Sequence, residues 1–320
     1  MNKILIIQTA FIGDVILATA VVEKLNQFYP ESKIDFLLRK GNEGLLENHP
    51  IINEVLIWDK KNKKYDNLKA ISRSVKRMQY DVIVNLQRYA SSGLITAFSG
   101  ANQKLGFKKN PLSFSFSKKF EHKIGDGTHE VERNQQLITH LTDKQSSKPK
   151  LYPSNKDYAD VEKYKKKDYV CMAPTSVWAT KELPQEQWIK LISKINDQQN
   201  IYLLGGDVDF DKCEEIKQLS KNKNVINLSG KLSFLASAAL MQHAKMNYVN
   251  DSAPLHITSA MNAPVTAYFC STKPSFGFGP LSDNQTIVEV KEKLECRPCG
   301  LHGKKKCPED HFDCGFNIEV

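Results

Sequence analysis

The sequence predicts an α/β protein of two domains, each built around a mostly parallel β-sheet. Short apolar runs typical of buried strands alternate with helical patterns along most of the chain. A polar stretch at residues 144–167 interrupts this alternation, which then begins again. The length of 320 residues also favours two cores over one. We therefore expect domains at residues 1–150 and 151–320, facing each other across a cleft.

The composition is that of a globular chain without a membrane span. Hydrophobic residues make up 41% and charged residues 25%. No apolar run approaches the roughly 20 residues that a transmembrane helix needs. The apolar start is too short for a signal peptide and lacks a cleavage site. We therefore expect a cytoplasmic protein.

The net charge of +9 is spread through Lys-rich patches at residues 60–64, 163–167 and 304–306. Such runs are usually solvated surface. They also suit an anionic membrane leaflet or a phosphorylated substrate. No recognisable nucleic-acid-binding motif accompanies them, so nucleic acid is not an expected partner.

In the first half, a continuous apolar strand at residues 3–8 leads into a loop containing Gly13 and Asp14, and then into a helix. Open α/β sheets build their ligand crevice from such loops, at the carboxyl ends of strands. The loop has neither a dinucleotide fingerprint nor a Walker A sequence. Asp14 suits two roles, as a cap of the helix or as a general base that removes a proton from a hydroxyl.

Further elements follow in the first half. Strand patterns occupy residues 34–38, 54–58, 80–86 and 104–107, and helical patterns occupy 67–78, 91–98 and 129–141. The polar segment 108–128 predicts a mobile loop.

The second half repeats the alternation. Strands are predicted at residues 169–173, 201–206, 225–228, 244–249 and 265–269, with helices at 185–195, 211–219, 234–242 and 257–261. Several of the strand ends carry groups suited to a bound anion, namely Thr175, Ser176, Lys181, Gly205, Gly206 and Lys231. We recognise no Asp-x-Asp pair of the kind that brings a divalent metal to a nucleotide-sugar. Lysines and a helix N-terminus would replace that metal's charge, so we expect metal-independent chemistry.

The segment 250–256 (Asn-Asp-Ser-Ala-Pro-Leu-His) joins a strand to a helix. Asp251 or Ser252 is expected to cap the helix, with Pro254 in its first turn. The first backbone N–H groups, from Ser252 and Ala253 onward, can then bind an anion, with His256 within reach. An ordinary helix cap beside a surface His is the alternative.

Seven Cys residues divide into two groups. Three are dispersed in or near apolar patterns and are expected to be buried thiols: Cys171, Cys213 and Cys270. Four form a C-x2-C-x7-C-x6-C cluster: Cys296, Cys299, Cys307 and Cys314. In a cytoplasmic protein this cluster favours a structural zinc site over disulfides, although its intervals are not those of a standard zinc ribbon.

Taken together in order, these motifs resemble glycosyltransferase family 9, the ADP-heptose:lipopolysaccharide heptosyltransferases, over nearly the whole length. The resemblance rests on residues 4–7 with 12–15, 173–176 with 181–184 and Trp188, 203–206, 228–231 and 250–256. It implies the GT-B fold, with two Rossmann-like domains whose parallel sheets face a central cleft. The Cys-rich end also resembles a feature of many members, which favours a structural role.

The resemblance also implies roles for individual residues. Asp14 would be the catalytic base, and Gly13, His129 and Arg133 would lie on the acceptor side. The donor nucleotide-sugar would be bound by Thr175, Ser176, Lys181, Gly205, Gly206, Lys231, Asp251, Ser252, Ala253 and His256. The sequence departs from the family pattern in three places: Ala253 for Gly, Leu183 for Trp, and Ala10-Phe11 for small hydroxyl residues. The prediction that the sugar is heptose is therefore less secure than the prediction of the family.

The resulting expectation is an inverting transferase that moves heptose from ADP-heptose to a lipopolysaccharide-core or lipid A precursor acceptor. It would need no cofactor and would lie at the inner face of the inner membrane. One alternative is a GT-B transferase or epimerase that uses another nucleotide-sugar. Another is a nucleotide-sugar-binding protein without catalysis.

Overall fold

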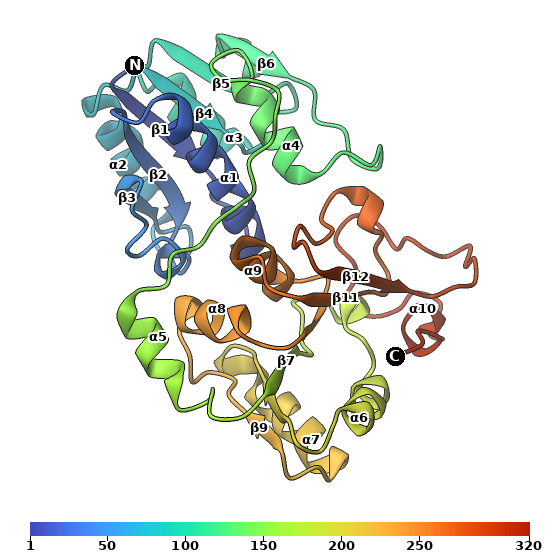
Figure 1. Ribbon diagram of the computed structural model, residues 1–320. Helices are drawn as coiled ribbons and strands as arrows, with labels where there is room; N and C mark the ends of the chain where they lie inside the picture. Colours follow the sequence, from blue (N-terminus) through green and yellow to red (C-terminus); the bar gives the residue numbers. More distant parts are fainter. The chain divides into compact units, whose positions relative to one another are not determined.

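A computed structural model describes all 320 residues, and the chain forms two compact units (Figure 1). Unit 1 comprises Met1–Ile124 and Thr128–Tyr152, and unit 2 comprises Gly125–Gly127 and Pro153–Val320. Each unit contains one six-stranded sheet. Every strand pairing in both sheets is parallel. The predicted pair of parallel α/β sheets is confirmed. None of the helices has the length and apolarity to cross a membrane.

The sheet of unit 1 has the strand order β3-β2-β1-β4-β5-β6. Its strands are β1 (Lys3–Ile7), β2 (Lys33–Arg39), β3 (Ile52–Trp58), β4 (Val82–Asn85), β5 (Gln103–Phe107) and β6 (Lys118–Phe120). Its helices are α1 (Ile12–Phe28), α2 (Lys64–Arg77), α3 (Ala90–Ala97) and α4 (Glu130–Gln135), with 3-10 turns at Glu43–Leu45, Ser113–Ser115 and Gln136–Ile138.

The core of unit 1 follows from the alternation of side chains along β1. Leu5 and Ile7 point to one face, where they share a buried cluster with residues of α2 and α3 such as Val75 and Ile95. Ile4 and Ile6 point to the other face and are fully buried as well. A strand buried on both faces has to be continuously apolar, which is what the sequence shows.

One expectation for unit 1 was wrong. The segment 108–128, expected to be a mobile loop, contains a 3-10 turn and strand β6. Phe116 is buried against Gly106, where a Cβ atom would lie 2.5 Å from the Phe116 ring. Asn110 donates hydrogen bonds to the backbone carbonyls of Gln87 and Tyr89, both at 3.1 Å. These contacts order a segment whose composition is polar.

The sheet of unit 2 has the strand order β12-β11-β10-β7-β8-β9. Its strands are β7 (Tyr169–Ala173), β8 (Asn200–Leu203), β9 (Val225–Asn227), β10 (Asn247–Asn250), β11 (Val265–Phe269) and β12 (Gln285–Glu289). Its helices are α5 (Asn155–Glu162), α6 (Gln185–Lys194), α7 (Phe210–Ser220), α8 (Phe234–Gln242), α9 (Ala253–Met261) and α10 (Asp313–Phe316), with 3-10 turns at Ala179–Lys181, Asp207–Asp209 and Pro274–Phe276. On one face, Met172 of β7 shares a buried cluster with Trp188, Ile216 and Ile318.

Each sheet reverses its strand order once. The reversal lies between β1 and β4 in unit 1, and between β7 and β10 in unit 2. At such a point the two loops leave the sheet toward opposite faces, and a crevice opens at the carboxyl ends of the strands. The loops that follow β1, β4, β7 and β10 are therefore the places where each unit is built to bind a ligand.

Candidate functional site

Asp14 lies just after β1, at the strand-order reversal of unit 1. It belongs to the first turn of α1, and the backbone N–H of Phe11 donates a hydrogen bond to Asp14 Oδ2 at 3.1 Å. The helix-capping role expected as one alternative is therefore present. The residue as a whole is half-buried.

The surroundings of Asp14 make it a stronger base than an ordinary Asp. Burial raises its pKa to about 6, and the negative charge of Glu130 adds to the rise. The Phe11 N–H and the positive charge of Arg88 oppose it. A carboxyl group with this pKa is still mostly ionised at neutral pH and accepts a proton more readily, as general-base catalysis requires.

Glu130 belongs to a buried ionic cluster on α4. Arg133 Nε donates to Glu130 Oε2 at 2.7 Å, and His122 Nε2 lies 3.7 Å from the same oxygen. Burial works to raise the pKa of Glu130, but His122 and the Arg133 charge outweigh it, so the pKa falls below its usual value. Glu130 is therefore ionised beside Asp14.

His129 and Arg133, predicted to contact an acceptor, have structural partners. His129 is the N-cap of α4, where its Nδ1 accepts from the Val131 N–H at 3.1 Å. Arg133 is only 2% exposed and also donates to the Thr128 carbonyl. A role in acceptor contact stays a prediction for both. Gly13 lies directly before Asp14 in the first turn of α1.

Lys60 and Arg88 are two cations near this site that the sequence analysis did not single out. Lys60 Nζ donates to the Thr9 carbonyl at 2.7 Å and to Thr9 Oγ1 at 2.9 Å, directly beyond β1. Burial, together with the charges of Arg39 and Lys64, lowers the pKa of Lys60 to about 8. The expectation that residues 60–64 are all solvated surface is therefore wrong for Lys60. The sequence did contain a signal for both residues. Lys60 and Arg88 follow the ends of β3 and β4 just as Asp14 follows β1.

In unit 2, Asp251 follows β10 and forms the centre of a tight polar group. Lys181 Nζ lies 2.6 Å from Asp251 Oδ2, and Thr272 Oγ1 donates to the same oxygen at 2.6 Å. Asp251 is 4% exposed, and the side chain of Lys181 keeps 15% of its surface exposed. The pair thus holds a cation at the carboxyl edge of the sheet with its outer side toward solvent.

The expected side-chain cap of α9 is not formed. Ser252 is the N-cap residue, but its side chain accepts no hydrogen bond from the helix; it instead donates a long 3.5 Å bond to the Asn250 carbonyl. Asp251 is engaged by Lys181 and Thr272. Because Pro254 lies in the first turn, its nitrogen has no hydrogen to satisfy. Of the two N–H groups predicted to bind an anion, that of Ser252 donates instead to the Asn250 carbonyl at 2.7 Å. The N–H of Ala253, the first residue of α9, has no side-chain cap, which suits it to an external anion.

Asn250 connects the end of β10 to the neighbouring loops of unit 2 by side-chain hydrogen bonds. Its Nδ2 donates to the Ala173 carbonyl at the end of β7 at 3.3 Å, and its Oδ1 accepts from the Leu183 N–H at 2.9 Å. The Ser176 N–H donates to Glu182 Oε1 at 2.8 Å, and Thr175 is buried next to it. Thr175, Ser176, Lys181, Asp251 and Ser252 thus come from loops joined at one edge of unit 2.

The remaining predicted donor residues have contacts of their own. A Cβ atom at Gly205 would lie 2.8 Å from Asp209 Cβ, so glycine is needed there for packing within the β8 and β9 loops. Lys231 Nζ donates to the Asn227 carbonyl at 2.9 Å. His256 is 5% exposed on α9, with its ring centroid 6.3 Å from that of Phe278.

The expectation that the chain lacks an Asp-x-Asp pair was wrong as to spacing, because Asp207 and Asp209 have it. Asp209 Oδ2 accepts from the Gly206 N–H at 2.7 Å, which stabilises the 3-10 turn at Asp207–Asp209. No group of three or more His, Cys, Asp or Glu side chains in the structure is arranged to hold a metal ion. The role visible for this pair is that of a turn cap.

The Cys-rich C-terminal segment packs directly on the Lys181 loop. The Lys304 N–H donates to Thr180 Oγ1 at 2.7 Å, and the Thr180 N–H donates back to the Lys304 carbonyl at 3.1 Å. Gly303 has a φ of +76°, and a Cβ atom there would lie 2.9 Å from Lys181 Cγ. Arg297 Nη2 donates to the carbonyl of Thr272, the residue that bonds Asp251, at 2.6 Å. The segment therefore supports both partners of the Lys181–Asp251 pair.

Within this segment the thiols are close neighbours. Burial raises the pKa of Cys314 to about 12, and the nearby thiols of Cys299, Cys307 and Cys296 contribute to the rise. Cys296 Sγ lies 3.9 Å from His311 Nε2. The side chains do not form a ready set of metal ligands, and a zinc site would require them to turn toward one another.

Comparison with known proteins identifies the family. The sequence profile described as "Glycosyltransferase family 9 (heptosyltransferase)" matches residues 68–311, which is more than half of the chain. The chain belongs to glycosyltransferase family 9. It is therefore an enzyme of the glycosyltransferase class. The matched range includes every donor-side candidate, whereas Asp14 precedes it.

Individual relatives cover almost the whole chain. Lipopolysaccharide heptosyltransferase 3 of Escherichia coli K12 is 29% identical over 290 residues, 85% of this chain and 83% of that protein. The solved structure of E. coli ADP-heptose LPS heptosyltransferase II has a TM-score of 0.80 at 19% identity, covering 93% and 95% of the two chains. E. coli heptosyltransferase WaaC with ADP has a TM-score of 0.73 at 20% identity, covering 89% and 92%. The fold is thus GT-B.

The pKa of Asp14 is directly measurable by NMR titration of its carboxyl carbon, assigned with the Asp14→Asn variant. We expect a value near 6 in the wild type. In Glu130→Gln the value should fall, because the second negative charge is removed while Arg88 stays. An ordinary Asp value in the wild type, or no change in Glu130→Gln, would contradict this description of the site. Thermal unfolding of the variant checks that α4 is retained.

Proposed function

We propose that this enzyme transfers heptose from ADP-heptose to a lipopolysaccharide-core acceptor, with inversion at the anomeric carbon. The observation that carries the proposal is the Lys181–Asp251 pair at the uncapped start of α9, at the strand-order reversal of unit 2. Family membership supports sugar transfer. The names of the relatives, which include an ADP-heptose LPS heptosyltransferase, support the choice of sugar, nucleotide and acceptor.

On the donor side, the diphosphate would bind at Lys181 and at the N–H of Ala253, since the Ser252 N–H donates to the Asn250 carbonyl at 2.7 Å. Asp251 would not repel it, because its charge is neutralised by Lys181 and its oxygen is engaged by Thr272. The Thr175 and Ser176 hydroxyls would supply further donors. Charge that grows on the leaving diphosphate would be stabilised by the Lys181 ammonium and by the positive end of the α9 dipole.

On the acceptor side, Asp14 would act as the general base. The acceptor oxygen attacks the anomeric carbon, the bond from that carbon to the diphosphate oxygen breaks, and Asp14 takes the hydroxyl proton. ADP leaves with the electron pair of the broken bond. A direct displacement of this kind inverts the configuration at the anomeric carbon. Lys60 and Arg88 would attract anionic groups of the acceptor toward this edge of unit 1.

Catalysis in this proposal needs no divalent metal, because Lys181 and α9 supply the positive charge. We further propose that the protein is cytoplasmic and peripheral at the inner face of the inner membrane, next to its lipid-linked acceptor. The basic balance of the chain suits that location.

A donor panel tests the proposed function. Purified enzyme and a heptose-deficient lipopolysaccharide-core acceptor are combined with ADP-heptose, UDP-sugars or GDP-sugars, with and without added Mg²⁺ or Mn²⁺. We expect transfer from ADP-heptose alone and no stimulation by either metal. Preferred use of another nucleotide-sugar would overturn the donor assignment. Dependence on added metal would instead contradict the metal-independent mechanism and make Asp207 and Asp209 candidate metal ligands.

Removal of the Lys181 ammonium should weaken ADP binding. We expect Lys181→Ala to raise the calorimetric Kd for ADP by roughly 10- to 100-fold, the usual effect of losing a charge-assisted hydrogen bond. Lys245→Ala is the matched control, because Lys245 pairs with Asp168 before the start of β7, at the opposite edge of the sheet. Equal ADP affinity in Lys181→Ala and wild type would contradict the donor-site assignment.

We also propose that Cys296, Cys299, Cys307 and Cys314 bind a structural zinc ion. What supports it is the sequence spacing of the four Cys residues. Metal analysis of protein purified without chelators should give about one zinc per chain. Metal-free protein with four titratable thiols and unchanged thermal stability would refute it.

A further inference from the structure

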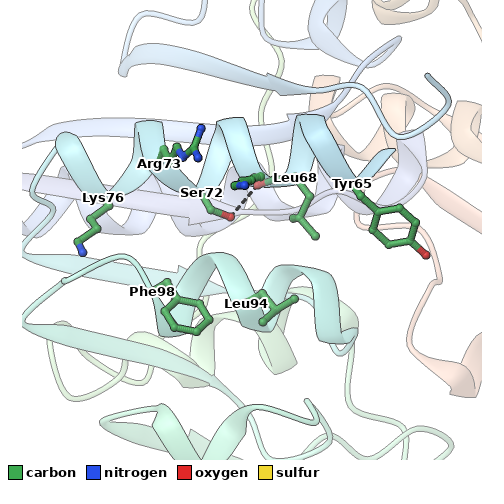
Figure 2. A pocket seen from close by; sticks show the side chains of 8 residues that line it. Tyr65, Leu68, Ser72, Arg73, Lys76, Leu94 and Phe98 are labelled. Carbon is green, nitrogen blue, oxygen red and sulfur yellow. Dashed lines mark hydrogen bonds between the residues drawn. The ribbon is translucent and has the colours of Figure 1, made fainter. Parts of the chain in front are cut away.

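A groove on unit 1 is not used by the proposed reaction. It lies between α2 and α3 and has a volume of about 310 Å³ (Figure 2). It is lined by Tyr65, Leu68, Lys69, Ser72, Arg73, Lys76, Leu94 and Phe98. By the bounds of the helices, six of these residues belong to α2, and Leu94 and Phe98 belong to α3 and its C-cap (Figure 2).

The groove exists because α2 places cations where a packed helix would place apolar side chains. Leu68, Ile71 and Val75 turn toward the core of unit 1. Lys69, Arg73 and Lys76 also line the groove, and all three are exposed. Ser72, between them, is too small to fill the gap and bonds the Leu68 carbonyl at 2.7 Å. The floor of the groove is therefore apolar and its rim is cationic.

The charged residues that line the groove are all cations. Residues 60–77 contain eight Lys and Arg residues against a single Asp. Lys69, Arg73 and Lys76 take no part in any of the ion pairs of the structure. Their charges remain available to an external anionic partner.

Two large side chains stand in solvent along the same groove. Tyr65 is 78% exposed and Phe98 is 64% exposed. Aromatic side chains that combine an apolar ring with nearby cations are typical of surfaces that enter the headgroup region of a bilayer. Lys64 Nζ lies 5.6 Å from the Tyr65 ring centroid, which adds a cation beside the ring.

We propose that the α2–α3 surface docks on an anionic phospholipid bilayer. Lys69, Arg73 and Lys76 would lie over lipid phosphates, Tyr65 and Phe98 would enter the interface, and the apolar floor would take part of an acyl chain. Charge complementarity favours a membrane as the partner, because a cationic rim with exposed aromatic rings matches a continuous anionic surface. The inference rests on the membrane placement proposed above and not on the identity of the donor.

Vesicle flotation of the full-length protein tests the surface. We expect binding to phosphatidylcholine vesicles that contain 30% phosphatidylglycerol, and little binding to pure phosphatidylcholine. Each basic residue near an anionic surface contributes roughly five-fold to partitioning. The triple variant Lys69→Gln, Arg73→Gln, Lys76→Gln should therefore bind on the order of 100-fold more weakly.

A second triple variant controls for net charge. Lys163→Gln, Lys166→Gln, Lys167→Gln removes the same charge from an exposed run of unit 2, and it should weaken partitioning by less than about five-fold, roughly the share of one basic residue. The double variant Tyr65→Ser, Phe98→Ser should keep the electrostatic attraction but lose binding in high salt by about 10-fold or more, because the ring burial is gone.

Three results would overturn the proposal. Equal losses in the two triple variants would show a general charge effect. If the wild type does not bind the anionic vesicles, a membrane is not the partner of the groove. The same conclusion would follow if the groove bound an acidic protein but no vesicles. Transfer to a water-soluble acceptor fragment separates the two proposals, since the groove variants should retain wild-type turnover there.

Discussion

The single reversal of strand order in each parallel sheet is the constraint on which both candidate sites depend. At β1 and β4, and again at β7 and β10, loops diverge and leave backbone groups and short polar side chains at the carboxyl edge. Asp14 and the Lys181–Asp251 pair lie at these two points. Their positions follow from the order of the strands within each sheet. The same architecture makes one unit suited to a base and the other to an anion.

The two sites use burial in opposite ways. Burial and the Glu130 charge leave Asp14 reluctant to ionise, which strengthens it as a base. Asp251 is more deeply buried than Asp14, but Lys181 and Thr272 satisfy its carboxylate and keep an ion pair intact. A buried carboxylate is stable only with such partners. Because Arg297 and Lys304 hydrogen-bond the loops of Thr272 and Lys181, the Cys-rich end supports the pair at which we propose that the diphosphate binds.

Sequence reasoning was sound where a pattern had one physical cause. Continuously apolar runs predicted the central parallel strands. The structure places the candidates Asp14, Lys181 and Asp251 beyond strand ends as expected, and their roles stay predictions. It failed where tertiary contacts decide. Strand β6 (Lys-Lys-Phe) is a short polar edge strand, and the edge strand β12 has only Ile287 and Val288 as apolar residues, neither fully buried. Asp251 looked like a helix cap because its partner Lys181 is 70 positions away, and the burial of Lys60 against Thr9 depends on β1 and β3 lying in one sheet.

The central claim is that Asp14 performs the proton transfer whereas donor binding belongs to unit 2. Asp14→Asn tests it most directly, because the amide oxygen can still accept the Phe11 N–H but cannot take a proton. Single-turnover transfer from bound ADP-heptose should slow by at least about 100-fold. The Kd for ADP-heptose should stay within about two-fold of the wild type, since no donor contact is lost. Near-normal turnover in Asp14→Asn would contradict the account.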